Sequence, residues 1–205
     1  MLAIIDYKAG NPGSIRNMLK KIGTEAVVTS EPDVIAKANK LILPGVGAFD
    51  YGMTNLENLG LLPVLHQRAL QDRVPVLGIC LGMQLFSRCS EEGKCSGLSW
   101  IDAETRKLSS NGGSGTLRIP HMGWNNVWTV RPSKLFQEVP AEPRFYFVHS
   151  YHVQVNSGPA AIALCKYGGD LVAAVEQDNI VGVQFHPEKS HKFGMKLLAN
   201  FIQFY

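Results

Sequence analysis

Residues 74–84, VPVLGICLGMQ, join a continuous apolar run to a pair of glycines that flank a cysteine. An apolar run with no polar alternation predicts a strand buried on both faces, which is typical of a parallel sheet. Gly78 and Gly82 allow a sharp turn after this strand, and residues 81–89 are predicted to open a helix. The stretch therefore predicts one strand–turn–helix unit of an α/β fold.

Similar units alternate through the first half of the chain. Strands are predicted at residues 2–6, 26–29 and 40–44, and helices at 14–22 with Ser14 as the N-cap, 32–38, and 49–70 with an interruption near Gly60 and Pro63. In the second half, strands joined by short turns are predicted at 100–108, 125–130, 144–155, 161–166 and 171–185, with a flexible loop at 109–115 and a closing helix at 191–204. We expect one α/β domain over residues 1–205, with an open, mostly parallel sheet, flanking helices and an antiparallel, strand-rich second half.

The composition excludes several classes of protein. The chain has 205 residues, of which 45% are hydrophobic and 18% charged, and its net charge is 20 − 17 = +3. This balance excludes bulk disorder, and the positive charge is too weak for a nucleic-acid-binding surface. No apolar run approaches the roughly 20 residues of a membrane-spanning helix, and no basic segment followed by an apolar one marks a signal peptide. We expect a cytoplasmic chain.

The four cysteines, Cys80, Cys89, Cys95 and Cys165, show no CxxC pairing. Without an export signal they are expected to be reduced thiols. Cys89 and Cys95 have the wrong spacing for a standard zinc site, and no second pair completes one. We therefore expect no metal and no organic cofactor.

Cys80 lies in the pattern G-x-C-x-G, between a predicted buried strand and a predicted helix. The two glycines let the chain turn sharply, so that the side chain between them projects as a nucleophile. A helix N-terminus also favours the thiolate form of a cysteine. The pattern predicts a nucleophilic thiol, and the alternative is a buried structural cysteine.

A base and an orienting acid are suggested by His186 and Glu188 in the string QFHPE. A residue before proline favours an extended conformation, in which residues i and i+2 face the same way. Glu188 would then hold one nitrogen of His186 and leave the other for Cys80. The pair ends an apolar strand predicted at 180–185, at the sheet edge where sites of α/β proteins gather. A surface ion pair is the alternative.

A third signal is the string PGVG at residues 44–47, at the end of the third predicted strand. Its glycines leave backbone N–H groups exposed, so those of Val46 and Gly47 could face a developing oxyanion together with the N–H of Leu81. The alternative is an ordinary strand-to-helix turn.

Five strings together resemble the class I, or triad, glutamine amidotransferases, and among them the glutaminase subunits of imidazole glycerol phosphate synthases. These strings are PGVGAF at 44–49, GICLGMQ at 78–84, PHMGWN at 120–125, YFVHSY at 146–151 and FHPEKS at 185–190. The resemblance covers essentially the whole chain and implies a flavodoxin-like α/β fold. It also implies a partner, a cyclase subunit of the (β/α)₈-barrel type that receives the ammonia.

The resemblance implies roles for individual residues. Cys80 would attack the side-chain amide of glutamine, His186 would protonate the departing ammonia and then activate water, and Glu188 would orient His186. Residues expected to contact bound glutamine are Gln84, Glu92, His149, Ser150 and Tyr151, and residues expected at the partner interface are Lys189, Trp124 and Asn11. Taken alone, Gln84 and His149 would be interpreted as structural polar residues.

Three other functions remain open at this point. An amidotransferase subunit could supply ammonia to another acceptor, as in systems that aminate sugar nucleotides, and it would carry nearly the same strings. A free-standing cysteine hydrolase or peptidase would share the G-x-C-x-G turn without PHMGWN or FHPEKS. A non-enzymatic binding module would have no need of the set Cys80, His186 and Glu188.

Overall fold

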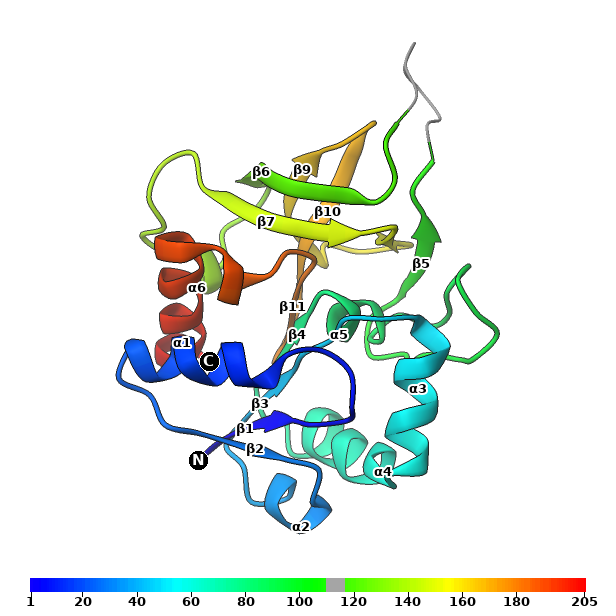
Figure 1. Cartoon of the computed structure of the whole chain (residues 1–205), viewed down its shortest axis with the longest axis vertical. Coiled ribbons are helices and arrows are strands. Elements are labelled where there is room, and N and C mark those ends of the chain that lie inside the picture. Colours follow the sequence, from blue (N-terminus) through cyan, green and yellow to red (C-terminus); the bar gives the residue numbers. More distant parts are fainter. Residues whose placement is uncertain (110–116) are drawn as a thin grey trace.

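The parallel half of the sheet forms where the chain carries its continuous apolar runs. The computed structural model describes residues 1–109 and 117–205, so all but Ser109 of the predicted loop at 109–115 lies outside the described residues. Five parallel strands lie side by side in the order β2 (Ala26–Thr29), β1 (Leu2–Ile5), β3 (Lys40–Leu43), β4 (Val76–Ile79) and β11 (Ile180–Val183) (Figure 1). Every residue of β1, β4 and β11 is buried, as a central parallel strand requires.

The same sheet continues with antiparallel strands. β10 (Asp170–Gln177), β9 (Ala161–Lys166), β6 (His121–Thr129) and β7 (Arg144–His149) follow β11 in that order. A second sheet pairs β5 (Ala103–Lys107) with β8 (Tyr151–Val155). The fold class expected from the sequence is thus confirmed over the described residues: a mixed α/β sheet with a parallel half and an antiparallel half.

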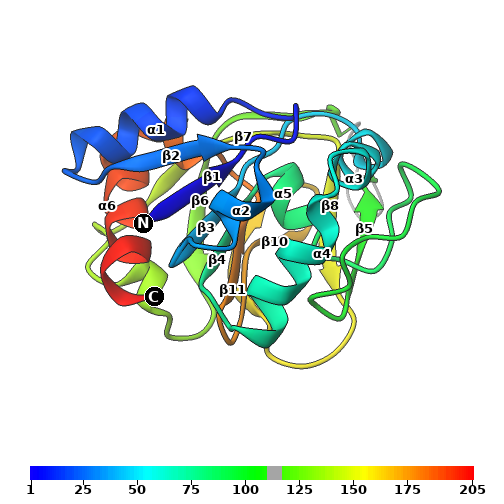
Figure 2. The ribbon, with the colours of Figure 1, turned by 90° about the horizontal axis from the view of Figure 1, so that it is seen from below.

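The helices cover the two faces of the parallel strands. Figure 2 shows α1 (Pro12–Lys21) and α6 (His191–Phe204) on one side, and α3 (Phe49–Asn58), α4 (Leu61–His66) and α5 (Leu81–Gln84) on the other. Alternation along a strand assigns its side chains to the two cores. In β1, Leu2 and Ile4 pack with the α1–α6 side, whereas Ala3 and Ile5 pack with the α3–α4 side. The remaining short helices are α2 (Pro32–Ile35), the π-helix η1 (Gln67–Gln71) and the 3₁₀-helices η2 (Lys134–Phe136) and η3 (Pro187–Lys189).

Two helix boundaries differ from the prediction. The N-cap of α1 is Asn11 rather than Ser14, because Pro12 occupies the first helical position and the Asn11 side-chain oxygen accepts the N–H of Ser14 at 3.2 Å. The helix predicted at 81–89 ends at Gln84, because the carbonyls of Leu85 and Phe86 accept hydrogen bonds from the chain near residues 98–101 instead of continuing the helix.

The predicted helix at 49–70 is split at Gly60, whose φ of +64° places it in the left-handed region that favours glycine. The predicted strand at 144–155 is also divided. Its first part, β7, pairs with β6, whereas its second part, β8, pairs with β5 in the other sheet. The chain therefore changes sheets at Ser150, and this change brings Ser150 and Tyr151 to the edge of a cavity described below.

No helix in residues 1–109 and 117–205 is long and apolar enough to cross a membrane.

Candidate active site

Cys80 directly follows β4 in a strained conformation. Its φ of +53° lies in the left-handed region that non-glycine residues rarely adopt, and such strain is often found at functional sites. The flanking glycines are required by close packing. A Cβ on Gly78 would lie 2.6 Å from the ring of Phe86, and one on Gly82 would overlap the carbonyl oxygen of Leu43. The sharp turn predicted around Cys80 is present, pressed against the end of β3.

His186 and Glu188 are in contact, as predicted, and their side chains are almost fully buried. Nδ1 of His186 lies 2.8 Å from Oε1 of Glu188, and the side chains are 1% and 4% exposed. The predicted local geometry is only half right. His186 is extended, but Pro187 begins the 3₁₀-helix η3, so the carboxylate returns to the ring through a helical turn rather than along a strand. The contact predicted between His186 and Glu188 is present, but the backbone between them forms a helical turn instead of the predicted extended segment.

The charge state of His186 depends on its two neighbours. Burial by itself would lower the pKa of His186, but the neighbouring Cys80 and Glu188 raise it to about 10. The site therefore favours the imidazolium over the neutral ring, as a thiolate–imidazolium pair would. No hydrogen bond joins the two partners in this structure, since Nε2 of His186 is buried without an acceptor among the described residues. Catalytic hydrogen bonds of this kind often tighten only when substrate is bound.

A cavity of about 230 Å³ opens beside Cys80. It is lined by every residue predicted for the oxyanion site and for substrate binding, namely Val46, Gly47, Leu81, Gln84, Glu92, His149, Ser150 and Tyr151, together with Cys80, Pro120 and Val148. A larger cavity, of about 890 Å³, lies at the opposite ends of the parallel strands, beside Pro75 and Asn179. Of these two cavities, the smaller is the one lined by a cysteine, and it lies at the carboxyl ends of the strands.

Tyr7 fixes the loop that carries the predicted oxyanion donors. Its buried hydroxyl donates to the carbonyl of Pro44 at 2.5 Å, and a Cβ on Gly45 would lie 2.6 Å from the same hydroxyl. Beyond this glycine, the N–H groups of Val46 and Gly47 have no acceptor within the described part of the chain. Because Val46 and Gly47 line the cavity, these donors are the candidates for binding an anion there. Tyr7 was not predicted as a site residue, although it follows the first predicted strand.

Glu92 is held at the cavity by a clasp, the reciprocal hydrogen bonds between residues 49–50 and residues 92–94. Its Oε2 accepts the N–H of Phe49, at the start of α3, at 2.8 Å. In return, the carboxylate of Asp50 accepts the backbone N–H of Lys94 at 2.9–3.0 Å. A Cβ on Gly93 would overlap this carboxylate, so a larger residue there would displace the Asp50 side chain. The clasp fixes Glu92 next to the predicted oxyanion loop.

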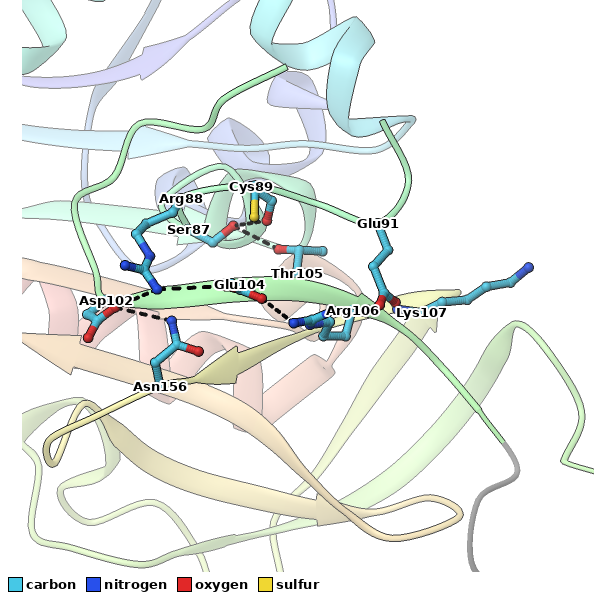
Figure 3. A network of polar contacts seen from close by, with 10 residues as sticks. All are labelled: Ser87, Arg88, Cys89, Glu91, Asp102, Glu104, Thr105, Arg106, Lys107 and Asn156. Atoms are coloured by element: carbon cyan, nitrogen blue, oxygen red, sulfur yellow. Dashed lines mark hydrogen bonds and ion pairs between the residues drawn. The ribbon is translucent and has the colours of Figure 1, made fainter. Parts of the chain in front are cut away.

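A polar network around β5 also holds the segment that carries Glu91 and Glu92 (Figure 3). Glu91 accepts from the backbone N–H of Lys107 at 2.7 Å and from Arg106 at 2.8 Å, and these contacts lower the pKa of Glu91. Beneath them the hydroxyls of Ser87 and Thr105 share a buried hydrogen bond of 3.0 Å. Exposed ion pairs contribute little individually, so we attribute the positioning mainly to the backbone and buried contacts.

His149 also lines the cavity, but both of its ring nitrogens are engaged. Nδ1 lies 2.8 Å from the carbonyl oxygen of Tyr151, which can only accept, so Nδ1 carries the proton. Nε2 then accepts from Nδ1 of His121 at 2.9 Å, and Nε2 of His121 accepts from the Asn125 amide at 3.1 Å. Any contact of His149 with a ligand would therefore use its backbone or ring carbons.

Burial lowers the pKa of both linked histidines, to about 4 for His121 and about 3 for His149. Below pH 6.5 these two histidines bind protons in the unfolded chain but stay neutral in the folded chain. The free energy of unfolding therefore falls as the pH falls toward 4. Each histidine contributes a slope of about 1.4 kcal/mol per pH unit at most. We expect His121→Gln to show a shallower loss than the wild type in denaturant unfolding between pH 7 and 4.5.

The matched control is Asn126→Gln, at an exposed and uncharged position of the same strand, which should keep the wild-type slope. Equal slopes in the wild type and His121→Gln would show that His121 is not held neutral.

The predicted interface residues lie near one another, outside the lining of this cavity. Trp124 is 45% exposed, and its ring stacks on His191 and meets the edge of Tyr146. Nζ of Lys189 lies 5.6 Å from the centre of the same Tyr146 ring. Asn11 caps α1, which packs against the 3₁₀-helix that carries Lys189.

The site has no features of a metal centre: within residues 1–109 and 117–205, no cluster of three or more His, Cys, Asp or Glu side chains could hold an ion. Its components are a thiol, an imidazole, a carboxylate and free backbone N–H groups around a small cavity. This combination suits nucleophilic attack on an amide or ester carbonyl.

A family model described as glutamine amidotransferase class-I matches residues 3–204. The chain belongs to this family. Two relatives that align over nearly their full length support the assignment. This amidotransferase is 52% identical to "Imidazole glycerol phosphate synthase subunit HisH 2" of Methanococcus maripaludis and 44% identical to the protein of the same description in Pseudomonas aeruginosa, each alignment covering 99% of both chains.

Solved structures support the fold of this amidotransferase at lower identity. One described as a glutamine amidotransferase superposes with a TM-score of 0.75 at 17% identity, covering 98% of this chain and 97% of that one. A chain from the structure of PurLQS of Thermotoga maritima gives 0.70 at 16% identity, covering 99% of this chain and 97% of that one. The family resemblance expected from the sequence is confirmed, and with it the assignment to the glutamine amidotransferase enzymes.

Proposed function

We propose that this chain hydrolyses glutamine to glutamate and ammonia and passes the ammonia to a (β/α)₈-barrel cyclase subunit. The observation that carries the proposal is the arrangement around Cys80, a strained nucleophile that lines a cavity together with Val46 and Gly47 and lies close to the buried pair His186–Glu188. We further propose that residues 1–205 act as one glutamine amidotransferase domain in the cytoplasm.

The first half of the reaction forms a thioester. The Cys80 thiolate attacks the side-chain amide carbon of glutamine, and the N–H groups of Val46, Gly47 and Leu81 bind the oxyanion. The C–N bond then breaks as His186 gives its proton to the leaving nitrogen, which departs as ammonia. His186 is neutral after this step and is ready to act as a base.

The second half releases glutamate. His186 removes a proton from water as the water oxygen attacks the thioester carbon, and the C–S bond breaks to return the thiolate. The new carboxylic acid loses its proton to solvent. Glu188 holds the imidazolium in place in both halves through its 2.8 Å contact with Nδ1. One glutamine and one water thus give one glutamate and one ammonia.

The acceptor is proposed from the relatives, which are described as subunits of imidazole glycerol phosphate synthase. With the cyclase, the chain would make imidazole glycerol phosphate and an aminoimidazole carboxamide ribotide from the ribulosyl formimino precursor. The test is to mix the chain with such a cyclase and measure glutamine-dependent formation of both products. Products expected only with both proteins support this acceptor, whereas amination of a sugar nucleotide in their place would assign the chain to a different partner.

Trp124 and Lys189 give a prediction about that partner. Both contact Tyr146 and both reach the surface beside the catalytic segment, so we expect them to touch the cyclase. Trp124→Ala and Lys189→Ala should each weaken association by about 10-fold or more, since loss of a buried aromatic anchor, or of one partner of a buried charge pair, is costly at an interface. Calorimetric titration of the cyclase measures this effect.

The matched control is Trp128→Ala, which removes a similarly exposed tryptophan from the far part of the same strand. It should leave the affinity unchanged. Wild-type affinity in both Trp124→Ala and Lys189→Ala would remove these residues from the proposed interface.

Val46→Pro tests the oxyanion donor directly, because proline has no N–H. Loss of one such donor costs about 10²–10³ in kcat, so a flip of this glycine-flanked peptide is large enough to switch the enzyme on and off. We expect that loss in kcat measured with the cyclase and its ligand, with little change in KM. Val46→Ala keeps the N–H and should lose far less. Stimulation like that of the wild type in a folded, partner-binding Val46→Pro would exclude this N–H as the switch.

A further inference from the structure

Gln184 lies against the sulfur of Cys80 and has no part in the mechanism described above. It directly follows β11, its side chain is buried, and its Nε2 lies 3.6 Å from Sγ of Cys80. In its thiol form the sulfur can also donate to the carbonyl oxygen of Val148, at 3.9 Å. The Gln184 nitrogen is therefore nearer to the sulfur than the Val148 carbonyl oxygen is.

The orientation of the Gln184 amide follows from the carbonyl of Tyr151, to which it is linked through the side chain of Gln84. The oxygen of Tyr151 can only accept, so the Gln84 atom 2.9 Å from it must be the amide nitrogen. That nitrogen has a second N–H, which faces the amide of Gln184 at 3.2 Å and requires an oxygen there. The nitrogen of Gln184 is then the atom that faces the sulfur, and it can only donate.

The Tyr151 carbonyl is itself held in place. His149 donates to it from Nδ1 at 2.8 Å, and with Gln84 this uses both of its acceptor sites. Reversing either amide would place two donors or two acceptors face to face in a buried site, where an unmade hydrogen bond is costly. The hydrogen bonds that link Tyr151 to Cys80 through Gln84 and Gln184 therefore have one favoured assignment of donors and acceptors, in which Gln184 donates to the sulfur.

We propose that Gln184 donates a hydrogen bond to the Cys80 sulfur and so favours the thiolate over the thiol. A donor aimed at an ionisable atom stabilises its anionic form, and burial makes the contact stronger than it would be in water. The inference rests on the proposed function only in taking Cys80 as the nucleophile. Gln184 would act together with the nearby imidazolium of His186.

The other ionisable groups around Cys80 do not provide the same effect. Tyr7, from the end of β1, stays neutral because burial raises its pKa well above the usual range, and its hydroxyl is committed to Pro44. His149, from β7, is neutral because burial lowers its pKa. Among the described residues, the charged groups near the sulfur are His186 with Glu188 behind it, and Glu92, which lines the same cavity and whose carboxylate is bound to the N–H of Phe49.

The test is the pH dependence of Cys80 alkylation in the full chain. Iodoacetamide reacts with the thiolate, so its rate against pH gives the thiol pKa, and mass spectrometry of the peptide identifies Cys80. In Gln184→Met, which keeps the shape but lacks the N–H, we expect the midpoint to rise by about one pH unit and the rate below both midpoints to fall about 10-fold. The exposed Cys89 in the same sample is the matched control and should keep its midpoint.

An unchanged Cys80 midpoint in Gln184→Met would overturn the proposal. If that variant does not fold, the side-chain amide protons of Gln184 in the wild type provide the test by NMR. Their resonances should move with the same midpoint as Cys80 alkylation, and a pH-independent position would contradict the proposal. Neither measurement uses glutamine. Failure of the glutaminase assay with a shifted midpoint would therefore reject the proposed function alone, and the reverse pattern would reject Gln184 alone.

Discussion

Cys80→Ala is expected to abolish glutamine hydrolysis, with a loss of at least about 10⁴-fold, because Cys80 is the one thiol among the described residues that line the cavity. Alanine also removes the steric demand of the side chain without changing the glycines that build the turn, so the variant should fold. The measurement is glutamate release from glutamine in the presence of the partner. Cys80→Ser should be similarly inactive, since a hydroxyl is far harder to ionise than a thiol beside His186.

The chain supplies its own controls for this variant. Cys89→Ala, Cys95→Ala and Cys165→Ala should retain hydrolysis, because none of these cysteines lines the cavity. Free ammonia should still support synthesis by Cys80→Ala with its partner, because the acceptor chemistry lies in the other subunit. Substantial turnover of glutamine by Cys80→Ala would remove the mechanism.

His186→Ala should reduce the rate by about 10²–10⁴-fold, which is the usual contribution of a general acid–base. The imidazolium both stabilises the thiolate and delivers the proton to ammonia, so both kcat and the pH profile should change. Glu188→Gln should lose less, because the amide keeps a hydrogen-bond partner for Nδ1 and removes only the charge. Steady-state kinetics of both variants across pH 6 to 9 test whether His186→Ala loses more activity than Glu188→Gln.

A normal rate in His186→Ala would transfer the role to another histidine. His149 has both ring nitrogens committed, so His152, whose Nδ1 is buried without a partner among the described residues, would be the next candidate.

The sequence predicted best where one short stretch contains all the information. The run from Val74 to Ile79 is apolar at nearly every position, and its burial on both faces could be inferred because only a central parallel strand needs such a run. The turn at Gly78 and Gly82 could also be predicted, because both glycines lie in the same short stretch. The contact of His186 with Glu188 joins residues two apart, so it too was within reach.

The contacts that sequence reasoning missed join distant parts of the chain. Tyr7 binds a carbonyl 37 residues away, and Gln184 meets a sulfur 104 residues away. Neither residue has a local pattern that marks it, because its partner is chosen by the order of strands in the sheet. The change of sheet at Ser150 was missed for a related reason: residues 144–155 alternate like a single strand, and only the two different partners, β6 and β5, divide them.

The most direct test of the central claim is glutamate release from glutamine by the wild-type chain, measured alone, with a (β/α)₈-barrel cyclase, and with the cyclase and its nucleotide substrate. We predict little release alone and a rise of about 10²-fold or more when the substrate is bound, which matches the gain of one oxyanion donor. Absence of glutamate in all three conditions, from protein whose Cys80 is shown to be intact, would contradict the account.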